Sequence, residues 1–153
     1  MRTVIQRVKS AEVRSGGQSA SIGRGFLLLV GLEKGDTTET TAWCANKIVG
    51  LRIFEDSNDK MNLSLADVGG EVLAVSQFTL AGNITRGRRP GFDAAMSPDE
   101  ARMVFDVFVS QLKSHQVVVK TGFFREHMEV ELINDGPVTF VLERGDITGI
   151  HSS

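Results

Sequence analysis

Two runs of alternating apolar and polar residues near the carboxyl end of the chain, 128–133 and 138–143, constrain its fold more than any other feature. Alternation with a period of two is typical of strands that bury one face, so both runs are predicted to be half-buried strands. Between them lies Asn134-Asp135-Gly136-Pro137, in which Asp-Gly is a common hairpin signal. Pro137, however, removes a backbone donor where the second strand should begin. The segment is therefore either a tight turn or backbone shaped for another purpose.

Further patterns predict more strands and two helices. Strands are expected over residues 4–13, as two short strands or one bent strand, and over 18–22, 26–32, 71–77 and 116–120. Asp36-Thr37-Thr38-Glu39 has capping-box spacing and predicts a helix that ends at Gly50. Ser97 as cap and Pro98 begin a second helix. Its apolar stripe predicts a core-facing side made of Ala101, Val104, Phe105, Phe108, Val109 and Leu112.

The composition bounds the class of protein. With 153 residues and 41% hydrophobic content, the chain can build one core, so residues 1–153 are read as a single domain with a frayed tail after about residue 145. A single cysteine, Cys44, excludes an internal disulfide framework and is compatible with a reducing compartment. Neither a signal sequence nor an apolar run of membrane-spanning length is present, so a cytoplasmic protein without membrane contact is expected.

The charge pattern limits what the chain can bind. A net charge of -2 argues against a general polyanion binder, because non-specific nucleic-acid affinity comes from many Lys and Arg contacts to phosphates. Arg86, Arg88 and Arg89 nevertheless crowd into one short, Gly-bounded stretch. They are either a solvated loop or a local site that grips the end of an RNA rather than its length.

A second segment, Ser76-Gln77-Phe78-Thr79-Leu80, follows a predicted strand and contains no His, Cys or carboxylate. Any chemistry there must come from backbone groups, hydroxyls and the substrate itself. A nucleophilic Ser76 or Thr79 would need a base within hydrogen-bond reach, and the nearest histidines in sequence are His115 and His127. A conventional triad is therefore not expected.

The histidines also lack metal-ligand spacing. His115, His127 and His151 stand singly, so neither a metal nor another cofactor is expected.

Taken in order along the chain, these segments resemble the D-aminoacyl-tRNA deacylase family. The resemblance rests on Val4-Ile5-Gln6-Arg7-Val8, Leu51-Arg52-Ile53-Phe54-Glu55-Asp56, Lys60-Met61-Asn62-Leu63, the Ser76 to Leu80 segment, Gly87-Arg88-Arg89-Pro90 and the Gly-Pro segment. It departs at residues 121–128, where members usually read closer to Thr-Gly-Arg-Phe-Gly-Ala-Asp-Met. Phe124 and Met128 keep the pattern there.

The resemblance implies a fold and a chiral filter. The expected fold is a three-layer, mixed α/β homodimer with mostly antiparallel strands and two main helices. The Gly136-Pro137 bond is expected to be cis, with two carbonyl oxygens that exclude an L side chain and admit a D side chain or glycine. Each site would be completed by the partner subunit's Gly136 and the partner subunit's Pro137, and Arg7 would hold this segment.

The resemblance also implies the reaction and its remaining residues. The expected substrate is the 3′ end of an aminoacyl-tRNA, whose ester is hydrolysed with help from the neighbouring ribose hydroxyl. Ser76, Gln77, Phe78 and Thr79 would form the catalytic segment, with an oxyanion hole from the backbone amides of Phe78 and Thr79. Phe124 and Met128 would form a pocket wall, and Arg86, Arg88 and Arg89 would contact tRNA.

Two other functions remain open from the sequence. A side-chain-specific editing domain, like that of archaeal threonyl-tRNA synthetases, shares the fold but removes an L-residue, and the Gly136-Pro137 pair speaks against it. A non-catalytic RNA-binding module would need extended basic or stacking surfaces. This chain has no Tyr and one Trp.

Overall fold

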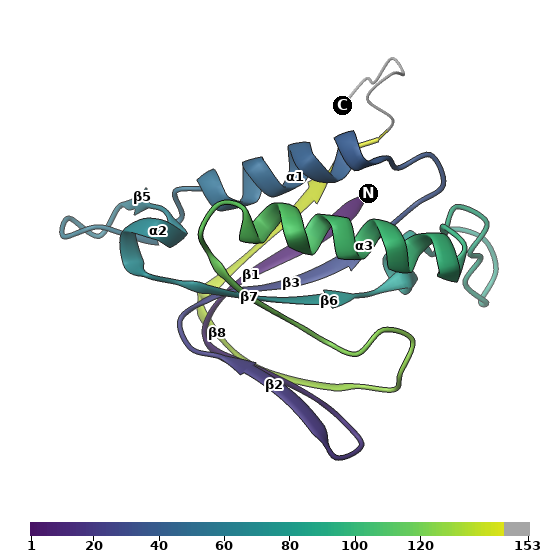
Figure 1. Ribbon diagram of the computed structural model, residues 1–153, viewed down its shortest axis with the longest axis horizontal. Coiled ribbons are helices and arrows are strands. Elements are labelled where there is room, and N and C mark those ends of the chain that lie inside the picture. Colours follow the sequence, from purple (N-terminus) through teal and green to yellow (C-terminus); the bar gives the residue numbers. More distant parts are fainter. Residues whose placement is uncertain (146–153) are drawn as a thin grey trace.

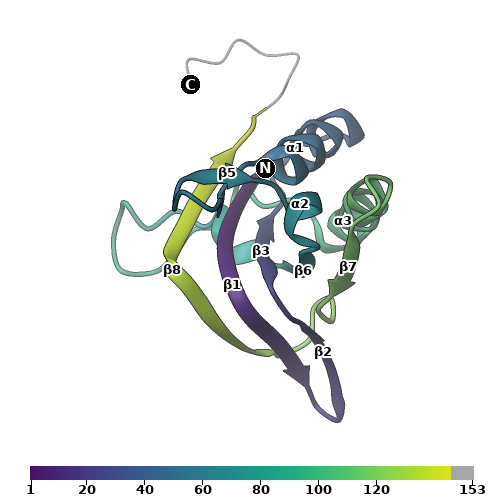
Figure 2. The same ribbon diagram turned by 90° about the vertical axis from the view of Figure 1, so that its left-hand side faces the viewer.

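The computed structural model describes residues 1–145, and within them one curled sheet carries most of the strands (Figures 1 and 2). Its strands are β1 (Arg2–Ser15), β2 (Gln18–Ile22), β3 (Gly25–Gly31), β6 (Glu71–Ser76), β7 (Val118–Thr121) and β8 (Glu129–Glu143). β1 pairs antiparallel with β8 along one edge, and along the other with β3 and then β2. β3, β6 and β7 are parallel to one another. The mostly antiparallel, mixed sheet that the sequence predicts is confirmed, and residues 4–13 belong to one long strand.

Helices cover one face of this sheet. The elements outside it are α1 (Thr38–Gly50), β4 (Phe54–Glu55), β5 (Met61–Leu63), α2 (Leu65–Val68), the 3-10 helix η1 (Phe78–Ala81) and α3 (Pro98–Lys113). α1 and α3 lie side by side in Figure 1, and the Gln111 side chain on α3 donates to the Thr38 carbonyl on α1 at 3.0 Å. Both main helices are therefore where the sequence predicts them, and α2 is an additional short one. None of the helices in residues 1–145 is long and apolar enough to cross a membrane.

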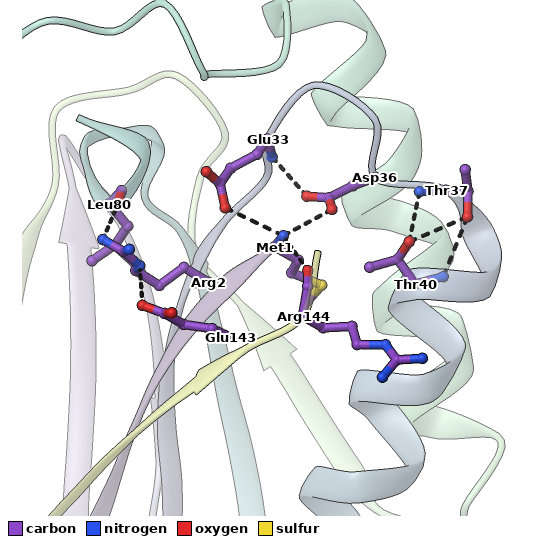
Figure 3. Close-up of polar contacts among 9 residues, drawn as sticks. All are labelled: Met1, Arg2, Glu33, Asp36, Thr37, Thr40, Leu80, Glu143 and Arg144. Carbon is purple, nitrogen blue, oxygen red and sulfur yellow. Dashed lines mark hydrogen bonds and ion pairs between the residues drawn. The ribbon is translucent and has the colours of Figure 1, made fainter. Parts of the chain in front are cut away.

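The sequence predicts the helices better than their caps. Thr37 caps α1 and forms its capping box with Thr40, so Asp36 is not the cap. Asp36 instead accepts a hydrogen bond from the Met1 amino group at 2.8 Å (Figure 3). At the start of α3, Ser97 occupies the cap position but its side chain makes no capping bond.

The core has two parts, one on each face of the sheet. The larger part fills the space between the sheet and the two main helices, with Phe26, Phe54 and Phe108 fully buried. The smaller part lies on the opposite face and includes Val13 and Leu73. Figure 2 shows that β2 and the lower half of β8 curl beneath that face. The third layer of the expected three-layer fold is thus formed by the same sheet, which bends round on itself.

The predicted hairpin near the carboxyl end is wrong, because both alternating runs belong to the single strand β8. Val8 pairs with Asn134 and Gln6 with Thr139, so residues 135–138 bulge opposite Arg7 alone. The Asn134 side chain replaces part of the interrupted ladder by accepting from the Val138 amide at 2.7 Å and donating to the Thr139 hydroxyl at 3.0 Å. A side chain therefore keeps the strand continuous where Asp-Gly would otherwise turn it back.

β8 is also more exposed than the half-buried pattern predicts. Four large apolar side chains on it face solvent in the single chain: Val130, Ile133, Phe140 and Val141, exposed by 37 to 59%.

The amino terminus lies beside the end of β8 (Figure 3). The Met1 amino group donates to the Arg144 carbonyl at 2.7 Å as well as to Asp36. Burial raises the pKa of the Asp36 carboxyl, while its bond with the Met1 amino group acts in the opposite direction. Arg2, next in sequence, pairs with Glu143 at 2.9 Å and donates to the Leu80 carbonyl at 3.4 Å. The chain start therefore ties β8 to η1. The expected frayed tail, 146–153, lies outside the described residues.

Candidate active site

The catalytic segment that the sequence singles out lies at the end of β6 and in η1. β6 ends at Ser76, and the Gln77 amide then donates to the Val30 carbonyl at 2.7 Å, which fixes the exit of the chain. η1 lies directly on Gly31, where a β-carbon would come within 2.7 Å of the Leu80 side chain. A residue larger than glycine at position 31 would therefore push this segment away from the sheet.

η1 leaves hydrogen-bond donors free for a ligand. The first amides of a helical turn, here those of Phe78 and Thr79, have no acceptor within the turn. Gln77 supplies no side-chain cap. The side-chain amide of Gln77 instead donates to the Thr79 hydroxyl at 2.5 Å. Both Phe78 and Thr79 are exposed. Across residues 1–145, no hydrogen bond joins a histidine to Ser76 or Thr79. The segment can thus offer positioned backbone donors and a hydroxyl.

A cleft of about 630 Å³ opens next to this segment. It lies at the carboxyl ends of the three parallel strands, since Leu32 follows β3, Gln77 and Phe78 follow β6, and residues 124–128 follow β7. Ligands bind at this end of parallel strands in many α/β proteins. Of the predicted site residues, the cleft gathers Ser76, Gln77, Phe78, Phe124 and Met128.

The wall that follows β7 is an ordered turn, although it departs from the family pattern. The Glu126 amide donates to the Phe123 carbonyl at 3.2 Å, and the Ser15 hydroxyl donates to the Glu126 carboxylate at 2.8 Å. The Phe123 amide contacts the Met128 sulfur at 3.2 Å. The Arg125 backbone has a positive φ of 62°, a conformation that glycine adopts more readily. The turn is therefore held at both ends.

Phe124 sits at the back of this wall. Its ring lies 6.4 Å from that of Phe105 on α3, and the Arg102 guanidinium stands 4.8 Å over its face. Phe124 thus links the cleft to the main core.

The Gly-Pro segment lies elsewhere on the chain. The Gly136-Pro137 bond is cis, as the resemblance implies. Arg7, only 4% exposed, donates to the Asp135 carbonyl at 2.9 Å and to the Ile53 carbonyl at 2.7 Å. Its guanidinium also lies 3.5 Å from the Glu55 carboxylate. Arg7 is thus a buried anchor for the residue before Gly136.

The cleft and the Gly-Pro segment do not meet within one chain. Arg7, Thr79, Gly136 and Pro137 are not among the residues that line the cleft.

The three arginines of the predicted RNA contact lie on an exposed arm. Asn83 and Gly91 exchange two backbone hydrogen bonds, at 2.7 and 2.9 Å, which close a loop over residues 84–90. Arg86, Arg88 and Arg89 are all exposed on this loop. Phe92, just after it, lies 5.3 Å from the Phe78 ring and lines the cleft. The arm is therefore joined to the cleft at its base.

Comparison with known proteins decides the family. A family model described as D-Tyr-tRNA(Tyr) deacylase matches residues 4–143. The chain belongs to this family. It is 56% identical to a D-aminoacyl-tRNA deacylase of Pelobacter propionicus, over 94% of this chain and 100% of that one. It is 54% identical to a D-aminoacyl-tRNA deacylase of Geobacter sulfurreducens, over 94% of this chain and 95% of that one.

Comparison with solved structures shows the same fold. The structure of a protein named c-Myc DNA Unwinding Element Binding Protein superposes with a TM-score of 0.88 at 38% identity, covering 94% of this chain and 99% of that one. A probable eukaryotic D-amino acid tRNA deacylase superposes with a TM-score of 0.80 at 17% identity, over 92% and 97% of the two chains. The second likeness shows the fold alone.

The cleft also contains residues that sequence reasoning missed. Met96, Ser97, Pro98 and Ala101 bring the start of α3 into it. Arg125 and His127 line it from the divergent wall. The parallel order of β3, β6 and β7 brings these segments together, and no local pattern reveals that order. Among residues 1–145, no three potential metal ligands of the His, Cys, Asp and Glu types come together.

Proposed function

We propose that this chain hydrolyses the ester of D-aminoacyl-tRNA and releases a free D-amino acid and tRNA. The main supporting observation is that a chain of the D-Tyr-tRNA(Tyr) deacylase family has Ser76, Gln77 and Phe78 in the lining of a cleft, with Thr79 next in the chain. The free amides of Phe78 and Thr79 suit the negative charge that develops on an ester oxygen during attack. A hydrolase of this kind needs neither a metal nor another cofactor.

The substrate supplies the activating group. Water attacks the ester carbonyl, the bond to the ribose oxygen breaks, and that oxygen leaves with a proton. The neighbouring ribose hydroxyl orients the water, while the Thr79 hydroxyl, held by Gln77 at 2.5 Å, positions the reacting group. This division of labour agrees with a segment that has exposed donors and, within residues 1–145, no histidine hydrogen-bonded to it. It also makes the enzyme specific for an RNA end.

Chirality is read by exclusion at Gly136 and Pro137. Their carbonyl oxygens stand over the α-carbon of the aminoacyl group, where an L side chain collides and a D side chain points away. Glycine has no side chain to exclude, so glycyl esters, including glycine mischarged on tRNA-Ala, are also cleaved. Arg7 supports this role, because it holds the Asp135 carbonyl directly before the dipeptide.

The active enzyme is a homodimer in which each cleft receives the partner subunit's Gly136 and the partner subunit's Pro137. Two observations support this assembly. The dipeptide does not line the cleft of its own chain. In addition, two of the exposed apolar side chains of β8, Phe140 and Val141, border a hollow of about 190 Å³ that a second copy can cover. Sedimentation should show a dimer, and Phe140→Asp should shift it toward monomer.

Arg86, Arg88 and Arg89 contact the tRNA backbone near the acceptor end. Their exposed arm adjoins the cleft through Phe92, so an RNA whose end enters the cleft passes close to them. Charged tRNA is a cytoplasmic substrate, and the enzyme works in that compartment.

The test is incubation of the protein with D-tyrosyl-tRNA and L-tyrosyl-tRNA in parallel. The proposal expects release of D-tyrosine alone. Hydrolysis of an L ester would favour the side-chain-specific editing domain. Tight RNA or DNA binding with no turnover would favour a binding module, as the name of the similar DNA Unwinding Element Binding Protein suggests for that protein.

A further inference from the structure

The charged wall of the cleft carries an inference about how this chain grips its substrate. Among residues 1–145, Arg125, Glu126 and His127 are the only charged or titratable side chains that line the cleft. The Glu126 carboxylate already accepts a hydrogen bond from Ser15 at 2.8 Å. Within the described part of the chain, neither Arg125 nor His127 makes a hydrogen bond or ion pair through its side chain. The wall therefore offers an uncommitted positive charge to whatever occupies the cleft.

The rest of the lining favours a nucleoside as the occupant. Leu32, Val75, Met96 and Ala101 are apolar, and Phe78 and Phe92 add aromatic rings. Phe124 contributes a third ring. Apolar and aromatic surfaces suit the flat face of a base, whereas a cation suits a phosphate.

The topology sets the order of these parts. η1 follows β6 and the charged turn follows β7, and these two strands are adjacent and parallel. The ester is assigned to η1 under the proposed function, on which this inference rests. In a nucleotide, the phosphate at the 5′ position lies on the opposite side of the ribose from the esterified hydroxyls. A nucleoside in the cleft with its ester at η1 thus turns that phosphate toward the other wall.

The geometry points to Arg125, with His127 beside it, as a binding site for the phosphodiester on the 5′ side of the terminal nucleotide of the tRNA. The ordered turn holds the Arg125 backbone in place through the Glu126 contacts, so the side chain extends from a fixed point on the wall. A guanidinium can donate two parallel hydrogen bonds to a phosphate. The side chain is exposed, so the contact is partly screened by water.

The test compares two D-tyrosyl-charged RNA hairpins that end in CCA. One has natural linkages, and the other has a neutral methylphosphonate on the 5′ side of the terminal adenosine. We expect Arg125→Gln to lower kcat/KM on the natural RNA by about fivefold, mainly through KM, as for a single exposed charge-assisted contact. It should have no effect on the methylphosphonate RNA, and Arg125→Lys, which keeps the charge but not the paired donors, should restore part of the lost activity.

Lys113→Gln is the matched control, because it removes the same charge at the opposite end of α3. Equal losses for Lys113→Gln and Arg125→Gln would mean a general field effect. If Arg125→Gln lowers kcat/KM equally on both RNAs, the phosphate contact would also be overturned. A loss confined to D-aspartyl and absent from D-asparaginyl substrates would instead assign Arg125 to the aminoacyl side chain. Thermal melts check that each variant is folded.

A binding measurement separates this inference from the proposed function. The affinity of uncharged natural and methylphosphonate hairpins for wild type and Arg125→Gln tests the phosphate contact without any hydrolysis. Suppose that the wild-type protein hydrolyses no D ester, while Arg125→Gln weakens binding of the natural RNA and leaves binding of the methylphosphonate RNA unchanged. This result would reject the proposed activity and support the phosphate contact. Identical affinities in all four combinations would reject the contact.

Discussion

Replacement of Arg7 by lysine tests how the Gly-Pro segment is held. The Arg7 side chain is 5% exposed and donates through two different nitrogens to two carbonyls, those of Ile53 and Asp135. Lysine keeps the charge but has one nitrogen, which cannot reach both carbonyls in the same geometry. One charge-assisted hydrogen bond to a buried carbonyl is therefore lost.

The magnitude follows from that single bond. Loss of such a bond costs about 1.5–3 kcal/mol of unfolding free energy. For a chain of this length, that loss lowers the melting temperature by about 3–12 °C. The assay is thermal denaturation of Arg7→Lys beside Arg14→Lys, a matched change on the same strand at a side chain that is 40% exposed. The Arg14 variant should melt like wild type.

Activity separates a structural role from a positioning role. If Arg7 places Gly136, the folded Arg7→Lys enzyme should lose about tenfold or more in kcat/KM toward D-tyrosyl-tRNA, since small misplacements are costly. A variant that melts lower but keeps wild-type kcat/KM per folded molecule would show that Arg7 serves the fold alone. A variant that matches wild type in both measurements would refute the bonding argument itself.

Three further changes follow from the same structure. Gly136→Ala should abolish D-aminoacyl and glycyl hydrolysis, and it should also destabilise the protein by about 1–3 kcal/mol in denaturant melts, because the residue has a φ of 140° and a β-carbon would lie 2.6 Å from Val138; wild-type stability would contradict the geometry. Thr79→Ala should slow turnover by about a hundredfold without preventing it, while substrate ending in 2′-deoxyadenosine should be far worse, and a trapped acyl-enzyme on Thr79 would show a nucleophile instead. Burial raises the pKa of the Cys44 thiol to about 11, so at pH 8 iodoacetamide should label the native protein at least about a hundredfold more slowly than the denatured protein; equal rates would contradict that burial.

Periodicity predicts the elements of this fold where local preference and tertiary packing agree. The stripe of α3 faces the core, with Phe105, Phe108 and Leu112 buried. The apolar run 26–32 gives β3, which is buried on both faces.

The prediction fails where distant residues override a local signal. Asp135-Gly136 reads as a turn, yet Asn134 bridges the bulge and Arg7, from the other end of the chain, holds Asp135. Asp36 reads as a cap, yet it bonds the Met1 amino group and leaves the cap to Thr37. Arg7 and Met1 are far in sequence from the residues that they bond, so neither can be identified as a partner from the local pattern.

Some residues of the candidate site can likewise be predicted from the sequence, and others cannot. Family motifs identify Ser76 to Thr79, Phe124 and Met128, and the cleft brings Ser76, Phe124 and Met128 together. The contribution from Met96 at the start of α3 was not predicted, because it depends on the parallel order of the strands.

Chiral discrimination by exclusion at Gly136-Pro137 can be measured with three esters on one tRNA. Glycyl, D-alanyl and L-alanyl esters differ by no more than one methyl group and its configuration. If exclusion operates, the wild-type enzyme hydrolyses the glycyl and D-alanyl esters and spares the L-alanyl ester. Rejection of the glycyl ester would show that the D side chain is recognised directly, and hydrolysis of the L-alanyl ester would show that no chiral exclusion operates.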